Sequence, residues 1–153
     1  FVLKYNINFY HKNCVLDLFA GSGALGLEAI SRGMKYGYFY ENNVNVISCL
    51  IENCKKICIN DNFEIKKENI LENNFLEIKN KIALVFIDPP FVDDICRVCN
   101  ELAVSNFLQK SSKIYVESGV EILEADLPEN WIKLKQKKAG KVHYYLFENC
   151  AVF

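Results

Sequence analysis

The sequence lacks any apolar run close to the roughly 20 residues that a membrane-spanning helix needs. Its longest run, Ile82–Ile87, suits a buried strand instead. No signal-peptide pattern opens the chain, and no internal repeat or low-complexity linker interrupts it. A charge excess is also absent, because 18 lysines and arginines face 19 aspartates and glutamates for a formal net charge of −1. These absences exclude a membrane helix and a whole-chain basic surface for indiscriminate nucleic-acid binding, but they are compatible with an enzyme that visits RNA.

Disulfide and metal motifs are scarce as well. The seven cysteines form an odd set without a secretory signal, so we expect reduced thiols in a cytoplasmic protein. Cys96 and Cys99 have the C-x-x-C spacing of a redox or metal site, yet no second pair and no histidine cluster accompanies them. We interpret both as structural thiols of a helix, because a free cysteine packs like a small hydrophobic residue. The sequence predicts no metal site and no membrane association.

The chain does contain enough apolar material for one folded domain. It has 153 residues, of which 51% are hydrophobic, and we expect a single, monomeric domain over residues 1–153. Strand-like and helix-like patterns alternate, which predicts an α/β fold with a mostly parallel sheet and an antiparallel C-terminal hairpin. The expected strands are 14–19, 36–40, 63–66, 84–87, 114–117 and a pair within 131–147 joined near 139–141, and the expected helices are 24–32, 44–58 and 91–108.

Lysines alternate with other residues in the first strand of the predicted hairpin. Lys133, Lys135 and Lys137 should lie on one face of that strand. We favour an outer strand whose charges prevent edge-to-edge pairing, and contact with phosphate is the alternative.

A glycine-rich turn lies between the first predicted strand and its helix. Gly21, Gly23 and Gly26 have the G-x-G-x-x-G spacing of a loop that binds a nucleoside-containing cofactor. Glycines there permit positive φ and close approach of a ligand, and the helix N-terminus presents unpaired N–H groups. Asp17, inside the strand end, can hold an ammonium group, which S-adenosylmethionine has and NAD lacks. The stretch therefore favours a methyl donor, and a tight turn without a ligand is the alternative.

Two further residues follow predicted strands. Glu41 ends the second strand, where a carboxylate accepts hydrogen bonds from ribose hydroxyls, although it also precedes the helix start at Asn42 and Asn43. Asn69 follows the third strand, where its amide can bond an adenine edge or merely stabilise a turn. We prefer the ligand role for Glu41 and leave both roles open for Asn69.

The second chemical motif is Asp88-Pro89-Pro90-Phe91, directly after the apolar fourth strand. Two prolines stiffen the backbone and remove two N–H donors, so carbonyl oxygens and the Asp88 carboxylate form a cluster of acceptors. Such a cluster suits an exocyclic amine of a nucleic-acid base, with Phe91 stacking on that base. Plain turn chemistry is the less favoured alternative.

The chain resembles a known family at this point. DLFAGSGALGLEAISRG, the strand ending in DPPF, YVES and the late GKVHYYLFE segment are similar to bacterial methyltransferases that modify guanine N2 in small-subunit ribosomal RNA. The resemblance covers nearly the whole chain. It implies a Rossmann-like methyltransferase fold with a seven-stranded sheet whose strand seven is antiparallel. It also implies S-adenosylmethionine as methyl donor and ribosomal RNA, within a small-subunit particle, as partner.

The resemblance also assigns residues. It implies that the methionine end of the cofactor contacts Asp17, Gly21 and Gly23, that its ribose contacts Glu41 and that its adenine contacts Asn69. Further cofactor contacts are implied for three residues, namely Phe19, Asn42 and Asp88. The implied catalytic and base-binding residues are those of the second motif, Asp88, Pro89, Pro90 and Phe91.

Three other functions compete with this interpretation. A DNA amino-methyltransferase uses the same D-P-P chemistry but needs a separate target-recognition region, for which 153 residues leave no room. A nicotinamide oxidoreductase does not explain the second motif, and a non-catalytic cofactor-binding module is the third alternative. The family's members begin with a basic arm before the first strand, and this chain starts with Phe1 near the last helical turn of that arm. We therefore expect a preceding segment that helps to engage RNA.

Overall fold

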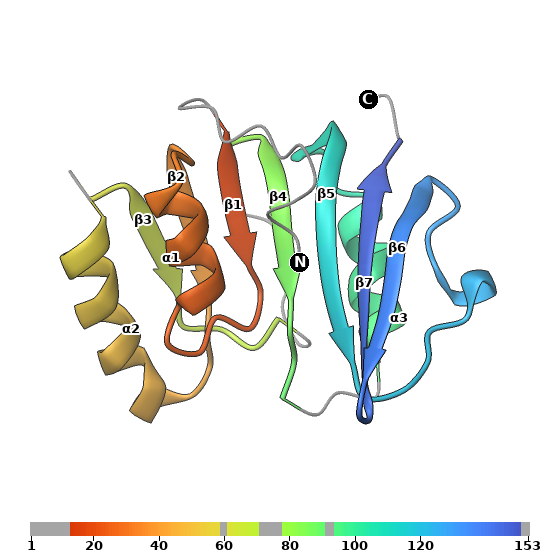
Figure 1. Ribbon diagram of the computed structural model, residues 1–153. Coiled ribbons are helices and arrows are strands. Elements are labelled where there is room, and N and C mark those ends of the chain that lie inside the picture. The colour runs from red at the N-terminus through yellow and green to blue at the C-terminus, as the bar shows by residue number, and fades with distance from the viewer. Residues whose placement is uncertain (1–12, 59–60, 71–77, 91–93, 151–153) are drawn as a thin grey trace.

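The computed structural model describes residues 13–58, 61–70, 78–90 and 94–150. Its centre is a seven-stranded sheet in the order β3-β2-β1-β4-β5-β7-β6 (Figure 1). The first five strands are parallel, and β7 runs antiparallel to both β5 and β6. The strand bounds are β1 Cys14–Asp17, β2 Tyr36–Tyr40, β3 Phe63–Lys66, β4 Ile82–Ile87, β5 Leu108–Ser118, β6 Trp131–Ala139 and β7 Val142–Asn149. The predicted α/β fold with an antiparallel C-terminal pair is confirmed.

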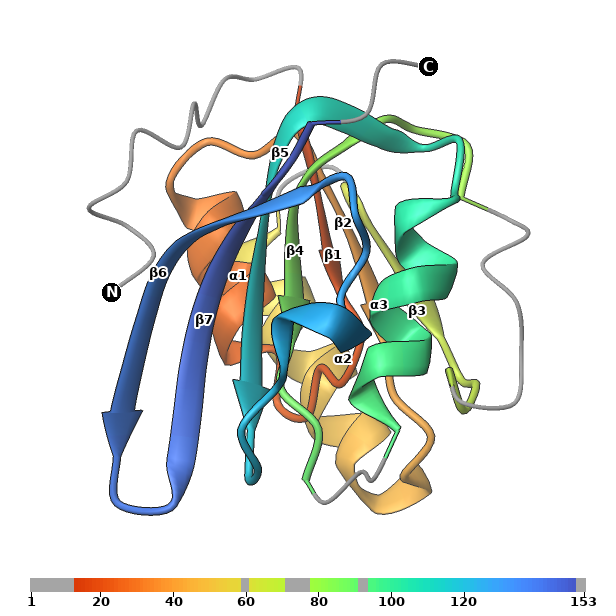
Figure 2. The ribbon, with the colours of Figure 1, turned by 90° about the vertical axis from the view of Figure 1, so that its right-hand side faces the viewer.

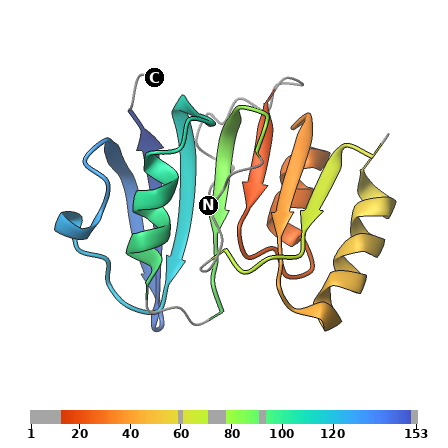
Figure 3. The same cartoon turned by 180° about the vertical axis from the view of Figure 1, so that it is seen from behind.

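Helices cover both faces of the sheet. α1 (Ala24–Ser31) and α2 (Val44–Ile57) lie over the β1–β3 half, and α3 (Ile95–Ala103) lies on the opposite face, as the view from behind shows (Figure 3). Seen from the side, the sheet separates α1 from α3 (Figure 2). A short 3₁₀ helix, η2 (Glu124–Asp126), precedes β6. Among the described residues no helix has both the length and the apolar character needed to cross a bilayer.

The core consists of two apolar layers separated by the sheet. Leu16, Val85 and Ile114 face the α3 side, whereas Val15 and Leu84 face the α1 side. Alternate residues of the central strands are therefore buried on opposite faces, which explains why these strands are continuously apolar. Cys99 of α3 is buried in the first layer and Cys96 packs against it, consistent with the structural role predicted for these thiols. All seven cysteines are free.

The predicted helix 91–108 is too long. α3 ends at Ala103, and the backbone N–H and hydroxyl of Ser105 both donate to the Leu102 carbonyl, which closes the last turn. Leu108 instead pairs with Ile82 and starts β5 six residues before the predicted strand at 114. A short apolar run fits a helix or a strand equally well, which is why the periodicity failed here. The part of that prediction at 91–93 lies outside the described residues.

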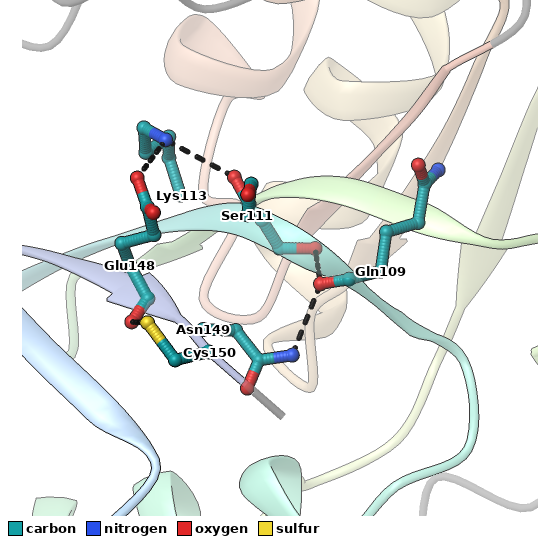
Figure 4. Close-up of polar contacts among 7 residues, drawn as sticks. Gln109, Ser111, Lys113, Glu148, Asn149 and Cys150 are labelled. Atoms are coloured by element: carbon teal, nitrogen blue, oxygen red, sulfur yellow. Dashed lines mark hydrogen bonds and ion pairs between the residues drawn. The ribbon is translucent and has the colours of Figure 1, made fainter. Parts of the chain in front are cut away.

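An irregular segment anchors the early part of β5. The register with β4 shifts between Ile82 and Leu84, and Ser111 has a positive φ of 65°. Figure 4 shows that Lys113 donates to the Ser111 carbonyl at 3.1 Å and pairs with Glu148 of β7. In the same view the Asn149 amide donates to the Gln109 carbonyl at 3.0 Å. These bonds tie the irregular segment to β7. The segment lies at the start of β5, at the edge of the sheet opposite the carboxyl ends of β1 and β4.

The lysines of β6 do not share one face. Lys133 lies opposite Phe147, but a bulge at Leu134 sets Lys135 opposite Leu146, and neighbouring residues of β7 face opposite ways. Lys133 therefore turns to the α3 side, where it pairs with Glu124 at 2.7 Å. The prediction that these lysines share one face is wrong, because no residue type in the sequence indicates the bulge. The prediction of an outer strand is confirmed, since β6 ends the sheet order.

Candidate active site

A cavity of about 680 Å³ lies at the carboxyl ends of the parallel strands. The arrowheads of β1 and β4 point to this edge in Figure 1. Four separate loops contribute its lining, which comprises Asp17 to Ser22, Ala24, Leu25, Tyr40 to Asn43, Val46, Glu68 to Ile70, Asp88 and Pro90. The strand order reverses direction between β1 and β4, and ligands of open α/β sheets bind in the crevice at such a point.

The turn after β1 depends on two glycines with positive φ. Gly21 has φ 54° and Gly23 has φ 87°, values that L side chains rarely adopt. Gly21 lines the cavity, and a Cβ there would meet nothing within 4 Å. A Cβ on Gly23 would lie 2.7 Å from Leu50, so this glycine is packed beneath the loop and is absent from the cavity lining. The two glycines therefore shape the turn, and Gly21 alone faces the space.

Asp17 is a carboxylate buried at the base of the cavity. Its exposed fraction is 2%, and Oδ2 accepts a hydrogen bond from the Gly26 N–H at 3.0 Å. Burial raises the pKa of Asp17 to about 7, and the nearby charges of Asp88 and Glu41 add to the rise. No described lysine or arginine forms an ion pair with it. A cationic ligand group would therefore be the positively charged partner that Asp17 does not find among the described lysines and arginines.

Glu41 connects the turn after β1 to the start of α2. Its Oε2 accepts from the Gly21 N–H at 2.8 Å, and its Oε1 accepts from the Asn43 N–H at 2.8 Å. Asn43 in turn caps α2, because its side chain accepts from the Asn45 N–H. A carboxylate oxygen has two lone pairs, so each oxygen of Glu41 can accept a further hydrogen bond from a ligand hydroxyl.

Three other predicted cofactor residues, Phe19, Asn42 and Asn69, also line the cavity. The sequence reading missed Val46 and Glu68, which line it as well. Val46 was detectable in principle, because it lies one helical turn after the Asn43 cap and so shares a side of α2 with it. Glu68 carried no signal beyond its position next to Asn69.

Asp88 marks the boundary between the cavity and the end of β5. Partial burial raises its pKa to about 6, and the negative charge of Glu117 on β5 adds to the rise. Pro90 lines the cavity beside it, whereas Pro89 is not part of the lining. Phe91 lies outside the described residues. At the rim, Asp88 can therefore accept hydrogen bonds from a group that approaches from the β5 side.

The carboxyl edge of the sheet is rich in hydrogen-bond acceptors. Asp17, Glu41 and Asp88 come from three different strand ends, yet Asp88 and Glu41 are close enough for their charges to raise the pKa of Asp17. Such a set suits a ligand with hydroxyl and cationic groups in the cavity and a second reactant with amine protons at the rim. In the part of the chain that the structure describes, no group of three His, Cys, Asp or Glu residues could hold a metal ion.

Comparison with known proteins identifies the family. The profile of the family described as Conserved hypothetical protein 95 matches residues 4–148. The chain is 35% identical over 150 residues to ribosomal RNA small subunit methyltransferase D of Haemophilus influenzae, covering 92% of this chain and 74% of that protein. The Escherichia coli K12 protein of the same name is 37% identical over 135 residues, covering 87% and 67%.

A solved structure agrees with these sequence matches. A protein described as the methyltransferase yhhF of Escherichia coli superposes with a TM-score of 0.81 at 35% identity, covering 95% of this chain and 79% of that one. The resemblance drawn from the sequence motifs is thus confirmed. The chain belongs to the family described as Conserved hypothetical protein 95 and is a methyltransferase.

Proposed function

We propose that this methyltransferase transfers a methyl group from S-adenosylmethionine to the exocyclic N2 amine of a guanine in small-subunit ribosomal RNA. The observation that carries the proposal is the position of Asp88, which lines the cofactor-sized cavity and also faces the end of β5. The names of the relatives support ribosomal RNA as the substrate. The motif resemblance to guanine-N2 methyltransferases supports the choice of atom.

The residues of the cavity fit S-adenosylmethionine. Asp17 suits the ammonium group of the methionine moiety, because it is buried without a described cationic partner. Glu41 retains lone pairs for two ribose hydroxyls, and Asn69 offers an amide to the adenine edge. When bound, the cofactor supplies a methyl group made electrophilic by its positively charged sulfur. NAD has no ammonium group for Asp17, which favours the methyl donor over a nicotinamide cofactor.

Asp88 is proposed to position the amine rather than to act as a strong base. The lone pair of an exocyclic amine is delocalised into the ring, and hydrogen bonds from its protons to Asp88 and the Pro89 carbonyl draw the nitrogen toward a tetrahedral geometry. Alignment of nitrogen, methyl carbon and sulfur then lowers the barrier. The proton can leave after methyl transfer, because the methylated nitrogen is briefly cationic and far more acidic than the free amine.

Single-turnover methylation of small-subunit ribosomal RNA tests this function. We expect Asp88→Ala to lower the rate by about 100-fold or more while leaving affinity for S-adenosylhomocysteine nearly unchanged. Asp88→Asn should retain more activity than Asp88→Ala, because its carbonyl still accepts one hydrogen bond. Digestion of the product RNA to nucleosides identifies the methylated atom.

Asp126→Ala serves as the matched control, because Asp126 is an exposed carboxylate on η2. It should methylate at the parent rate. An unchanged rate for Asp88→Ala would contradict the amine-holding role. Methyl transfer to DNA adenine in preference to ribosomal RNA would contradict the proposed substrate.

A further inference from the structure

The ends of β4 and β5 place a second carboxylate beside Asp88. Ile87 of β4 pairs with Val116 of β5, so Asp88 and Glu117 follow at the same level of neighbouring strands. Parallel strands lie about 4.8 Å apart, and the charge of Glu117 acts directly on Asp88. Glu117 is not part of the cavity lining. With the strand order β1-β4-β5, it lies on the side of Asp88 away from the turn after β1.

Tyr115 fixes the orientation of Glu117. The Tyr115 hydroxyl donates to Glu117 Oε1 at 2.7 Å, and among the described residues no other side chain is seen donating to this carboxylate. The Tyr115 residue is only 6% exposed, and its ring meets Phe86 edge-on at 6.1 Å between centroids. The packed ring fixes the position of the hydroxyl, so this hydrogen bond orients Glu117 Oε1 without any ligand. Its other oxygen stays available as an acceptor.

Two adjacent carboxylates repel each other unless a ligand brings two adjacent donors. Among the four RNA bases, only guanine carries a ring N–H, at N1, next to an exocyclic amine, at N2. Adenine and cytosine each present a ring nitrogen acceptor beside the amine, which a carboxylate would repel. Of the four bases, guanine is therefore the one whose edge offers a donor to each of the neighbouring carboxylates Asp88 and Glu117.

We propose that Glu117, oriented by Tyr115, is the residue that selects guanine: it accepts the N1–H while Asp88 accepts the N2 amine. This inference rests on the proposed function and deepens it. Methyl transfer itself needs only the amine, so Glu117 contributes to the choice of base. A site built to hydrogen-bond one polar edge disfavours bases that lack it, because an acceptor that loses water to the base is then left without a donor.

The test combines a variant with a base analogue. The methylated guanine is first mapped. Two synthetic ribosomal RNA fragments are then compared, one with guanine at the mapped position and one with 2-aminopurine. 2-Aminopurine keeps the N2 amine but has no N1–H. We expect Glu117→Ala to slow single-turnover methylation of guanine about 10- to 100-fold, the range for one hydrogen bond to a charged group. On 2-aminopurine the same variant should lose little, because the bond is already absent.

Conservative variants and a control separate recognition from structure. Glu117→Gln should recover part of the rate on guanine through its carbonyl, and Tyr115→Phe should lower it by a smaller factor. Glu129→Ala, at an exposed carboxylate before β6, should match the parent on both fragments. Equal losses on guanine and 2-aminopurine for Glu117→Ala would overturn the inference. Absence of N2 methylation of the guanine fragment by the parent protein would instead overturn the proposed function, and the inference with it.

Discussion

Single residues at the carboxyl edge are acidic groups that form no ion pair with a described lysine or arginine. The charges of Asp88 and Glu41 add to the raised pKa of Asp17, the charge of Glu117 adds to that of Asp88, and no ion pair with a described lysine or arginine involves Asp17, Glu41 or Asp88. An acid without a cationic partner loses stability when it is buried, and perturbed pKa values of this kind gather at functional sites. Two environments differ here: Glu41 is held by two backbone N–H groups, whereas Asp17 is buried.

Glu41→Ala should weaken S-adenosylhomocysteine binding by about 1–3 kcal/mol, the range for hydrogen bonds to a charged group. The variant removes the acceptors proposed for the ribose and also the two bonds that hold Gly21 and Asn43 in place. Titration calorimetry measures the effect, with Glu52→Ala on the exposed side of α2 as control. An affinity equal to that of the parent would remove Glu41 from the site.

The raised pKa of Asp17 makes stability depend on pH. The folded protein keeps the proton up to about pH 7, whereas the unfolded chain releases it near the ordinary value of 3.8. The folded state therefore binds more protons between pH 4 and pH 7, and the free energy of unfolding should fall as pH rises through that window. Asp88, with a pKa raised to about 6, acts in the same direction.

Urea unfolding at several pH values measures this dependence. Asp17→Asn should remain neutral throughout, so the parent should lose stability relative to the variant as pH rises from 4 to 7. The difference between the two proteins isolates Asp17 from all other titrating groups. If the two stability curves run parallel with pH, Asp17 is not protonated in the folded state.

At the scale of elements, one glycine determines how closely α1 approaches the sheet. A Cβ on Gly26 would lie 2.5 Å from the Phe39 ring and 3.1 Å from Asp17 Oδ2. Gly26→Ala should therefore lower the free energy of unfolding by about 1–3 kcal/mol, the cost of overpacking a filled core. Urea denaturation measures it, with Gly119→Ala as control because a Cβ there meets nothing within 4 Å. Equal midpoints for both variants would contradict the close packing.

The sequence predicted elements well wherever local pattern and tertiary context agreed. Strands 36–40 and 63–66 have the expected bounds, because glycine, asparagine and charged residues punctuate apolar runs there. It failed at Phe107 and Leu108, where an apolar pair continued the helical periodicity of α3 but belongs with the sheet. It failed again at Leu134, because a bulge changes register without a distinctive residue type.

The sequence could predict those residues of the candidate site that lie at the ends of recognisable strands. Asp17, Glu41 and Asp88 each follow or end an apolar strand, and parallel strands bring such positions to one edge. Glu117 lies near the end of β5 and follows the same rule, yet its position beside Asp88 depends on the register between β4 and β5. The early part of β5 shifts that register, so local sequence could not show which residue of 114–118 lies beside Asp88.

For the whole molecule, the strand order brings distant parts of the chain to one cavity. Asp17 ends β1 and Asp88 directly follows the neighbouring strand β4, although α1, β2, α2 and β3 separate them in sequence. The loops after β1, β2, β3 and β4 all reach the cavity, so a ligand that filled it would contact the ends of four parallel strands. Unfolding of any of these strands would destroy the binding site. Ligand binding should therefore stabilise the entire domain against global unfolding.

Thermal unfolding with and without ligand tests this coupling and the identity of the cofactor together. S-adenosylhomocysteine at 100 times its dissociation constant should add about 2.7 kcal/mol to the free energy of unfolding. For a domain of this size that corresponds to a rise in Tm of about 5–11 °C. NADH at the same concentration should produce no rise, because it offers no ammonium group to Asp17. A rise with NADH and none with S-adenosylhomocysteine would reassign the cavity to a nicotinamide cofactor, since only a ligand that binds the folded state can raise the Tm.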